Sequence, residues 1–451
     1  MIAIVVVVCS ILFLSGTYII WPSRWNIGAH LSLGLGLVGY VIPVFFTGIL
    51  DFFPQDIVRF YAKLLVVGAA CYVLGLVIGA RIPVSRLVRS KLSFSSLPYG
   101  VFESRTLRRT TLLLTLGLVG MLVCFYVMGF IPMFAEDPFT AKYFRGAYEE
   151  PFKQVAWSYR LCDSVVIVLL PVAYSLWYST RRFSHLFLSV VGTGILALTL
   201  ARGPMAVGFL VFLGLVAAGQ RNRKWFWAYI AVVLFLYPFG AAFYHIFGYV
   251  FGLDKYMVVQ FDTPWELITR GSPDVSDQLN LLGAFLDYGS FTYGRTFVGG
   301  LLPGSGNSRW NPSIWAMTLV AGGWNKTNLN ELGGGGFRLP VSMWGYTAFG
   351  WSGAVAVSFL SGLILGWATA FVKKFIDEKS ILKSIVAMTL FSTLGGQLAA
   401  FYWLSIYSVP QILVALLLTY RGKPMAAGLE QQRVYKSTRV GQSQRVFAPR
   451  S

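Results

Sequence analysis

Histidine and cysteine are scarce in this chain. Only 3 histidines and 4 cysteines occur among the 451 residues, and each cysteine lies alone in an apolar stretch. The chain therefore lacks the spaced ligands of zinc and iron–sulfur sites and the paired spacing of a disulfide framework. We expect no metal site, no cofactor and no disulfide.

Charged residues are also few, at 12% of the chain, whereas hydrophobic residues make up 56%. A soluble fold cannot hide so much apolar surface, and a helix of about 20 apolar residues crosses a membrane. About eleven segments meet that length: 1–20, 28–50, 60–80, 110–131, 161–179, 183–201, 204–219, 225–250, 347–371, 384–402 and 405–420. The sequence predicts an all-α, polytopic integral membrane protein with one transmembrane domain over residues 1–420.

The basic residues are unevenly distributed over the loops between these segments. Most of the 37 lysines and arginines fall in one alternate set of loops and in the tail, and the other set is nearly neutral. By the positive-inside rule, the N-terminus is outside and the C-terminus inside. The net charge of +19 is thus a topology signal, so we expect no nucleic-acid partner. Residues 421–451 are expected to form a basic, disordered cytoplasmic tail.

The predicted external side carries two long loops, at about 132–160 and 251–346. Long irregular loops in compact proteins usually have a function. Within the second loop, 263–270 and 276–289 are candidates for short helices lying in the membrane interface. We expect the functional site on this side.

Arg202 stands between two apolar segments in "LALTLARGPMAVGFL". Gly203 and Pro204 break the helix there, and Pro204 is suited to the first turn of the next helix. A loop arginine that reaches the lipid headgroups is one interpretation. The other is an anion site beside a helix N-terminus, where backbone N–H groups also attract negative charge.

Further basic residues of the same side lie among aromatic and glycine residues. Arginine suits phosphate because its guanidinium donates two parallel hydrogen bonds. Together with Arg202, the arginines of this side predict a site for a lipid-linked phosphate or pyrophosphate; they are Arg145, Arg160, Arg295, Arg309 and Arg338.

Aromatic residues are dense in the second loop. They are interpreted either as an interfacial belt or as surfaces that stack on sugars. The candidates for sugar contact are Tyr293, Trp344 and Tyr346.

Three stretches together resemble the Wzy-type oligosaccharide repeat-unit polymerases of O-antigen, capsule and exopolysaccharide synthesis. They are "MGFIPMFAEDPFTAKYFRG" (128–146), "LALTLARGPMAVGFL", and "YGRTFVGGLLPGSGNSRWNP" with the later "SMWGYTAFGWSGAV". The resemblance covers roughly residues 110–370. The acidic residue often found before the last tyrosine of the family pattern is absent, because Trp344 and Gly345 occupy that region.

The resemblance implies a GT-C-like fold in a bacterial inner membrane, with its active site on the periplasmic side and no metal. It implies transfer of a growing glycan from undecaprenyl pyrophosphate to a lipid-linked repeat unit, with membrane lipids and a chain-length regulator as further partners. In the first stretch, Lys142 and Arg145 match the basic residue that follows the family's Gly-x-Ile-Pro-Leu-Phe pattern, so the resemblance implies that they contact the substrate. Arg202 and Arg295 would stabilise the leaving pyrophosphate, and Glu331 and Asp287 are candidate general bases.

Three other interpretations remain open. An O-antigen ligase has similar helices and arginines, but usually carries a histidine in its large loop, and 251–346 has none. Another GT-C glycosyltransferase would favour paired acids in the first external loop, where only Asp51 and Asp56 occur. A flippase or transporter would place charges and broken helices near the middle of the membrane.

Overall fold

The computed structural model of the chain describes residues 1–83, 104–200, 202–234, 274–299, 307–323, 339–377, 388 and 409–419. Every regular element in these ranges is helical, and they contain no strand, which confirms the predicted all-α class. The α-helices are α1 (Ile2–Ser15), α2 (Thr17–Ile20), α3 (Ile27–Gly36), α4 (Ile42–Phe46), α5 (Gln55–Arg81), α7 (Ser104–Met128), α8 (Pro138–Lys142), α9 (Glu149–Thr180), α10 (Phe183–Leu198), α11 (Arg202–Gln220), α14 (Asp274–Tyr288), α15 (Arg295–Val298), α16 (Pro312–Val320), α17 (Val341–Asp377) and α19 (Val409–Thr419).

Four helical stretches within the described residues are long and apolar enough to cross a membrane. They are Gln55–Arg81, Leu107–Phe134, Thr140–Tyr178 and Val341–Asp377. From Leu112 to Tyr126 the outward face of α7 is mainly apolar, where a helix in water would present polar residues. The exposed side chains of this face are Leu112, Leu116, Val119, Leu122, Val123 and Tyr126.

Shorter apolar helices account for some of the other predicted segments: Ile2–Ser15, Phe183–Leu198 and Gly208–Gly219. Apart from Met388, the predicted segment 384–402 lies outside the described residues, as do most of 225–250 and the tail 421–451. The count of eleven spans, the GT-C-like arrangement and the orientation in the membrane stay predictions.

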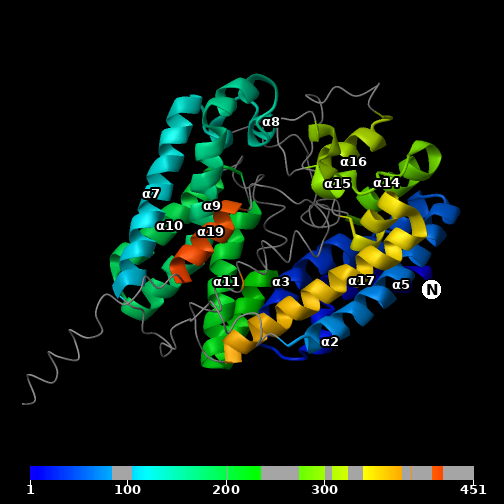
Figure 1. Cartoon of the computed structure of the whole chain (residues 1–451), viewed down its shortest axis with the longest axis horizontal. Helices are drawn as coiled ribbons and strands as arrows, with labels where there is room; N and C mark the ends of the chain where they lie inside the picture. Colours follow the sequence, from blue (N-terminus) through cyan, green and yellow to red (C-terminus); the bar gives the residue numbers. More distant parts are fainter. Residues whose placement is uncertain are drawn as a thin grey trace, which may run out of the picture.

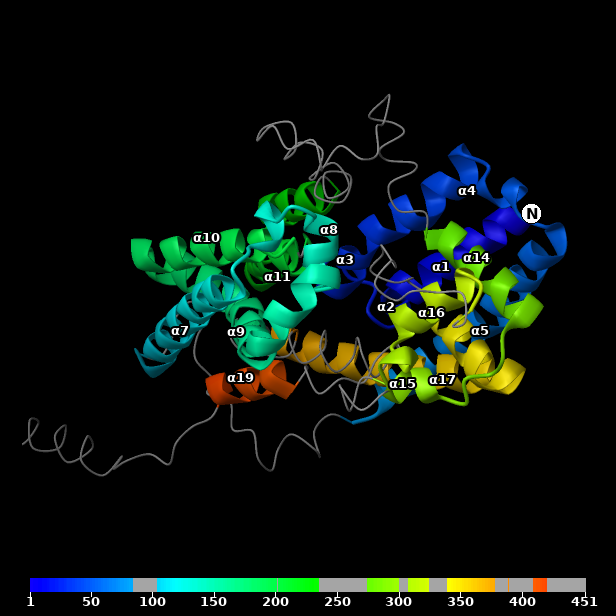
Figure 2. The same cartoon turned by 90° about the horizontal axis from the view of Figure 1, so that it is seen from above.

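The described helices form two bundles (Figures 1 and 2). In the α7–α11 bundle, α9 is central and contacts α7, α10, α11 and α19. In the α1–α5 bundle, the dominant contact is between α5 and α17, and α14, α15 and α16 cover its upper end in Figure 1. Helix α11 contacts both α3 and α17 and so joins the two bundles.

The two ends of the molecule differ in the loops that they carry. Helices α8 and α14–α16, from the two loops predicted to be external, lie at the upper end in Figure 1, which we call the outer end. Helices α9, α11 and α17 finish at or just before Arg181, Arg221 and Asp377 at the opposite, basic end. The predicted alternation of loops across a membrane stays a prediction.

Glycines form the seam between α5 and α17. Gly75 and Gly79 on α5, and Gly362 and Gly366 on α17, are each spaced by four residues. A Cβ atom on any of the four would overlap backbone atoms of the other helix. Such small-residue spacing lets two membrane helices approach backbone to backbone.

Helix α17 is broken near its outer end. Phe349 (φ −142°, ψ 20°) and Gly350 (φ 66°, ψ −149°) are not helical. The residues before the break fold back along those after it, because a Cβ atom on Gly345 or Gly353 would overlap the carbonyl oxygen of the other. The segment 341–348 is therefore a short half-helix packed against the longer part of α17.

This half-helix enters the α1–α5 bundle. Ser342, in its first turn, is fully buried and lies against Gly68 of α5. Gly68 is thirteen residues beyond Gln55, which is about 20 Å along that helix. The predicted external loop extended to residue 346, with the next span from 347; the structure instead begins the helix at Val341 and places 341–346 beside α5.

A second irregularity occurs between α3 and α4. The chain there forms a π-helix, η1 (Leu37–Val41), and such widened turns occur often at functional sites. A Cβ atom on Gly39 would lie within 2.5 Å of Oδ2 of Asp274, so the glycine makes room for this buried carboxylate. Helix α14 therefore begins directly against the widened turn.

Hydrogen bonds tie α14 to the bundle from its inner face. The hydroxyl of Tyr61 donates to Oε1 of Gln278, and Nε2 of Gln278 donates to the hydroxyl of Tyr40 over 2.7 Å. All three side chains are buried. The predicted short helix at 276–289 is thus confirmed as α14, and its packing on α5 and η1 fixes the position of the loop that follows it.

Candidate functional site

The first basic cluster consists of Lys142, Arg145 and Arg160. Nζ of Lys142 and Cζ of Arg145 each lie 5.3 Å from the centre of the Tyr143 ring, and Cζ of Arg160 lies 5.4 Å from the centre of Phe152. Each cation is half-buried. Because the face of an aromatic ring attracts cations, these contacts fix the charged groups in place.

Aromatic rings connect the members of this cluster. Phe144 stacks on Phe152, with ring centres 3.7 Å apart and planes at 8°. Tyr159 meets both rings edge-on, at 5.2 and 5.6 Å. Phe144 has φ 52°, an uncommon value for a bulky residue. The outer loop and the first turns of α9 therefore form one packed unit.

The turn before Arg202 contacts this unit. The side chain of Tyr159 interacts with that of Thr199 at the end of α10. Leu200 follows with φ 59°, and α11 begins at Arg202. A break between two helices occurs here as predicted, but it lies at Thr199 and Leu200, and Arg202 to Pro204 already belong to the first turn of α11. The side chain of Arg202 lies outside the described residues.

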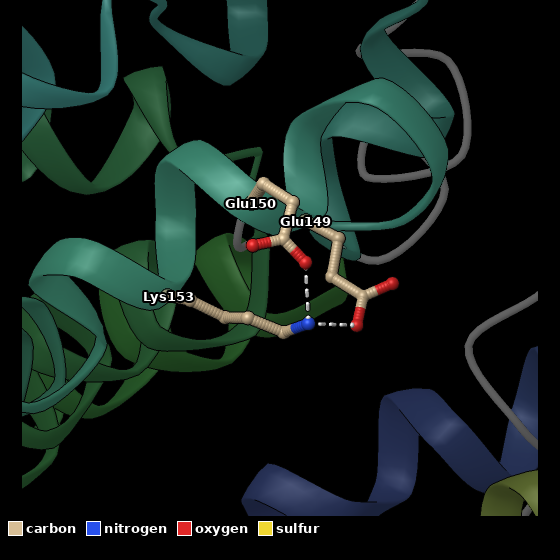
Figure 3. A network of polar contacts seen from close by, with 3 residues as sticks. All are labelled: Glu149, Glu150 and Lys153. Carbon is tan, nitrogen blue, oxygen red and sulfur yellow. Dashed lines mark hydrogen bonds and ion pairs between the residues drawn. The ribbon is translucent and has the colours of Figure 1, made fainter.

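Carboxylates at the start of α9 hold a further cation. Nζ of Lys153 lies 2.9 Å from Glu149 and 2.7 Å from Glu150, and Figure 3 shows the ammonium group held between the two carboxylates. All three side chains are largely exposed. Lys153 is therefore neutralised locally, in contrast to the cations that lie on aromatic rings.

The second basic cluster consists of Arg295 and Arg309, which share one indole ring. Their Cζ atoms lie 5.1 and 5.4 Å from the centre of Trp310. Both arginines are exposed, and within the described residues neither forms an ion pair. Two guanidinium groups beside one ring leave their N–H donors available to an anion.

The break in α17 positions this second cluster. The backbone N–H groups of Thr292 and Tyr293 donate to the carbonyl oxygens of Thr347 and Ala348, at 2.9 and 3.1 Å. Those carbonyls are free because the helix stops at Phe349. The resulting turn, with φ 49° at Tyr293 and 76° at Gly294, leads directly into α15 and Arg295.

The three predicted aromatic contacts lie in different surroundings. Tyr293 is 68% exposed, whereas Trp344 is 1% exposed and packs on Trp315. Tyr346 is half-buried among other rings, with Phe60 the nearest at 5.2 Å. In this conformation only Tyr293 presents an open ring to a sugar, and Trp344 has a core position.

Of the two predicted general bases, the structure describes only Asp287. Asp287 is exposed in the last turn of α14, and no hydrogen bond or ion pair joins it to either cluster within the described part of the chain. Glu331 and Arg338 lie outside the described residues. The identity of the general base stays a prediction.

The two basic clusters belong to different bundles. Helices α8 and α15 lie on the sides of their bundles that face each other in both views. Among the described residues, no hydrogen bond, ion pair or ring contact joins the clusters. The expected convergence of the arginines on one site stays a prediction.

Sequence reasoning missed the side chains that hold the cations. Tyr143, Phe152 and Trp310 provide the ring faces for all five basic candidates whose side chains are described. The available signal was that basic and aromatic residues are neighbours in the sequences "KYFR" and "RW". The hydrogen bonds from the turn at Tyr293 to the carbonyl oxygens of α17 could not be read from the sequence, because the donors and acceptors are more than fifty residues apart.

A scan of protein-family models, a search of curated proteins and a search of solved structures each found no match to this chain. The fold itself defines the class: an all-helical protein with four candidate membrane-spanning helices and basic clusters, braced by aromatic rings, at one end. No group of three or more His, Cys, Asp or Glu side chains able to hold a metal occurs among the described residues.

Proposed function

We propose that the chain is a membrane glycosyltransferase that polymerises lipid-linked oligosaccharide repeat units at the outer end of the molecule. One observation carries the proposal. All five described basic candidates lie on aromatic rings, and they gather in two clusters at the end where the long loops lie. Such cations suit pyrophosphate, and exposed rings such as Tyr293 suit sugars.

In the proposed reaction, a hydroxyl oxygen of the acceptor sugar attacks the anomeric carbon of the growing glycan. The bond from that carbon to the pyrophosphate oxygen breaks, undecaprenyl pyrophosphate leaves, and the hydroxyl proton passes to a base. Negative charge builds up on the leaving oxygen. Guanidinium groups held in advance stabilise that charge without reorganising, which is how Arg160, Arg295 and the N-terminal turn at Arg202 would act.

The test is polymerisation by the purified chain. The full-length protein in nanodiscs, supplied with undecaprenyl-pyrophosphate repeat units, is expected to give a ladder of glycan lengths on a gel. Arg160→Ala and Arg295→Ala are each expected to lower the initial rate about 100-fold, the usual effect of removing one donor to a developing charge.

Lys153→Ala is the matched control. It removes a cation from the same outer loop, but one that Glu149 and Glu150 already neutralise. We expect its rate to stay within about twofold of the unchanged chain, since exposed ion pairs contribute little. An equal loss of polymerisation rate in all three variants would mean that the clusters act only as general surface charge. A folded protein that gives no ladder would contradict the polymerase proposal.

A transporter of the same lipid-linked substrate is the second candidate, favoured by one observation. The discontinuous α17 and its half-helix inside the bundle are features that transporters use near their substrate sites. A reconstituted transporter would move a fluorescent lipid-linked oligosaccharide between leaflets without lengthening it. Lengthening without movement favours the polymerase.

A further inference from the structure

A shallow pocket lies at the basic end of α17. Its volume is about 470 Å³, and its described wall is formed by Ala370, Lys373, Lys374 and Asp377. These positions are three, four and seven residues apart, so they form one stripe along a helix. The pocket is far along the chain from the basic clusters, and the proposed reaction does not use it.

The charge in this pocket is positive. Lys373 and Lys374 are exposed and form no ion pair within the described residues. The acid of the stripe, Asp377, is already engaged, because its Oδ1 lies 3.2 Å from Nη2 of Arg221 on the end of α11. Two lysines, one arginine and one aspartate leave an excess of positive charge beside the depression.

The helix end that carries the pocket is held in place. Val372, Phe375 and Ile376, on another face of α17, are buried in the core of the α7–α11 bundle. This packing prevents rotation of the last turns of α17, so the lysines keep their position relative to the depression. The exposed Arg221–Asp377 pair adds a contact between the same end and α11 of the neighbouring bundle.

The position of the pocket points to a lipid ligand. Helix α17 is one of the four stretches long enough to cross a membrane, and the lysines lie in its last two turns. The end of such a helix lies at the level of the phosphate groups of the surrounding lipids. Basic pockets at the ends of membrane helices are suited to anionic headgroups.

We propose that the Lys373–Lys374 pocket binds the phosphate of an anionic membrane phospholipid. The group that the pocket binds is a phosphate anion. The position of the pocket favours the headgroup of a membrane lipid as the molecule that carries this phosphate, and free inorganic phosphate is the alternative. Zwitterionic lipids such as phosphatidylcholine should compete poorly, because their choline cation offsets the charge of the phosphate and is repelled by the two lysines.

The experiment is native mass spectrometry of the purified full-length chain in neutral detergent, titrated with phosphatidylglycerol, phosphatidylcholine or inorganic phosphate. We expect preferential binding of phosphatidylglycerol. K373Q/K374Q should weaken it about 25-fold, which corresponds to about fivefold for each lysine near a membrane surface. Asp377→Asn should strengthen it several-fold, because the substitution removes the acid and releases Arg221.

R223Q/K224Q is the matched control, since it also removes two exposed cations just beyond α11 but none from the pocket. It should change phosphatidylglycerol binding about twofold or less. Equal losses in the two double variants, or no preference over phosphatidylcholine, would overturn the proposal. Binding of inorganic phosphate that is lost in K373Q/K374Q would support the phosphate site and change its source to a free anion.

Discussion

The glycines of the two bundles pack against different kinds of atoms, backbone atoms in one bundle and side-chain atoms in the other. In the α5–α17 seam, Cβ atoms on Gly362 and Gly79 would overlap backbone oxygens of the facing helix. In the α7–α11 bundle, a Cβ atom on Gly192 would meet side-chain atoms alone, the nearest of them on Leu170 at 3.0 Å. A side chain can change its rotamer, whereas a packed backbone cannot move without separating the helices. The α1–α5 bundle should therefore be the less tolerant of substitution.

The bundles also hold their basic clusters differently. Arg145 and Arg160 lie on rings that belong to one continuous stretch of chain, the outer loop and α9. The position of Arg295 depends on carbonyls that the break in α17 leaves free. Changes in α17 should therefore affect the second cluster and leave the first intact.

The largest effect is expected for Gly362→Ala. Its methyl group would overlap the carbonyl oxygen of Tyr72 and force α5 and α17 apart. We expect destabilisation by about 3 kcal/mol, the upper range for overpacking, measured as a lower unfolding temperature in detergent.

Gly194→Ala is its control, because a Cβ atom on Gly194 of α10 has no neighbour within 4 Å. Alanine is the better helix former by about 1 kcal/mol, so this variant should be neutral or slightly more stable. Equal unfolding temperatures for the two variants would contradict the expectation that the α5–α17 seam is the less tolerant of substitution.

The next largest effect is expected for Gly350→Ala. Its φ of 66° and ψ of −149° lie in a region that is nearly closed to residues with a Cβ atom, at a cost of about 1–3 kcal/mol. The variant should lower the unfolding temperature and the polymerisation rate, because the turn before Arg295 depends on the break. Gly129→Ala, at a left-handed position with open space around it, should be milder; the reverse order would contradict the break in α17.

A smaller effect is expected for Tyr61→Phe. The substitution removes the hydroxyl that donates to Gln278 and leaves a buried amide oxygen without that donor. Hydrogen bonds between membrane helices contribute about 0.6 kcal/mol on average, and loss of a buried partner costs about 1–2 kcal/mol. Proteolysis of the 251–346 loop should become faster as α14 loosens. Tyr126→Phe, on an 87% exposed side chain, should leave the rate of cleavage unchanged.

The smallest effect is expected for Arg221→Gln. The Arg221–Asp377 pair joins the two bundles, but its side chains are 56% and 50% exposed. Exposed ion pairs contribute about 0–1 kcal/mol, so the unfolding temperature should hardly change. A large decrease would show that this pair, rather than apolar packing, connects the bundles.

Much of the helical layout was predictable from local composition. The apolar runs around α5, α7, α9 and α17 predicted helices at the right places, although α9 begins at Glu149 instead of 161. That difference arises because the first turns of α9 are amphipathic and charged. Hydropathy marks where a helix enters lipid, not where its first turn begins.

The candidate site was only partly predictable. The residue types around Lys142, Arg145 and Arg309 pointed to anion binding before any contact was known. The burial of Trp344 was not predictable, because its partner Trp315 comes from a separate helix. Composition alone does not distinguish a tryptophan that faces a sugar from one that fills a core.

By itself, the sequence determined that the described chain is helical and apolar enough for a membrane. Within lipid every backbone N–H and C=O must be paired, and a helix pairs them within its own segment. Only the tertiary structure decided that 341–348 folds into the bundle, that glycines of α5 and α17 meet, and that Arg295 and Arg309 share one ring. Each of these depends on contacts between residues distant in the chain, which no local pattern specifies.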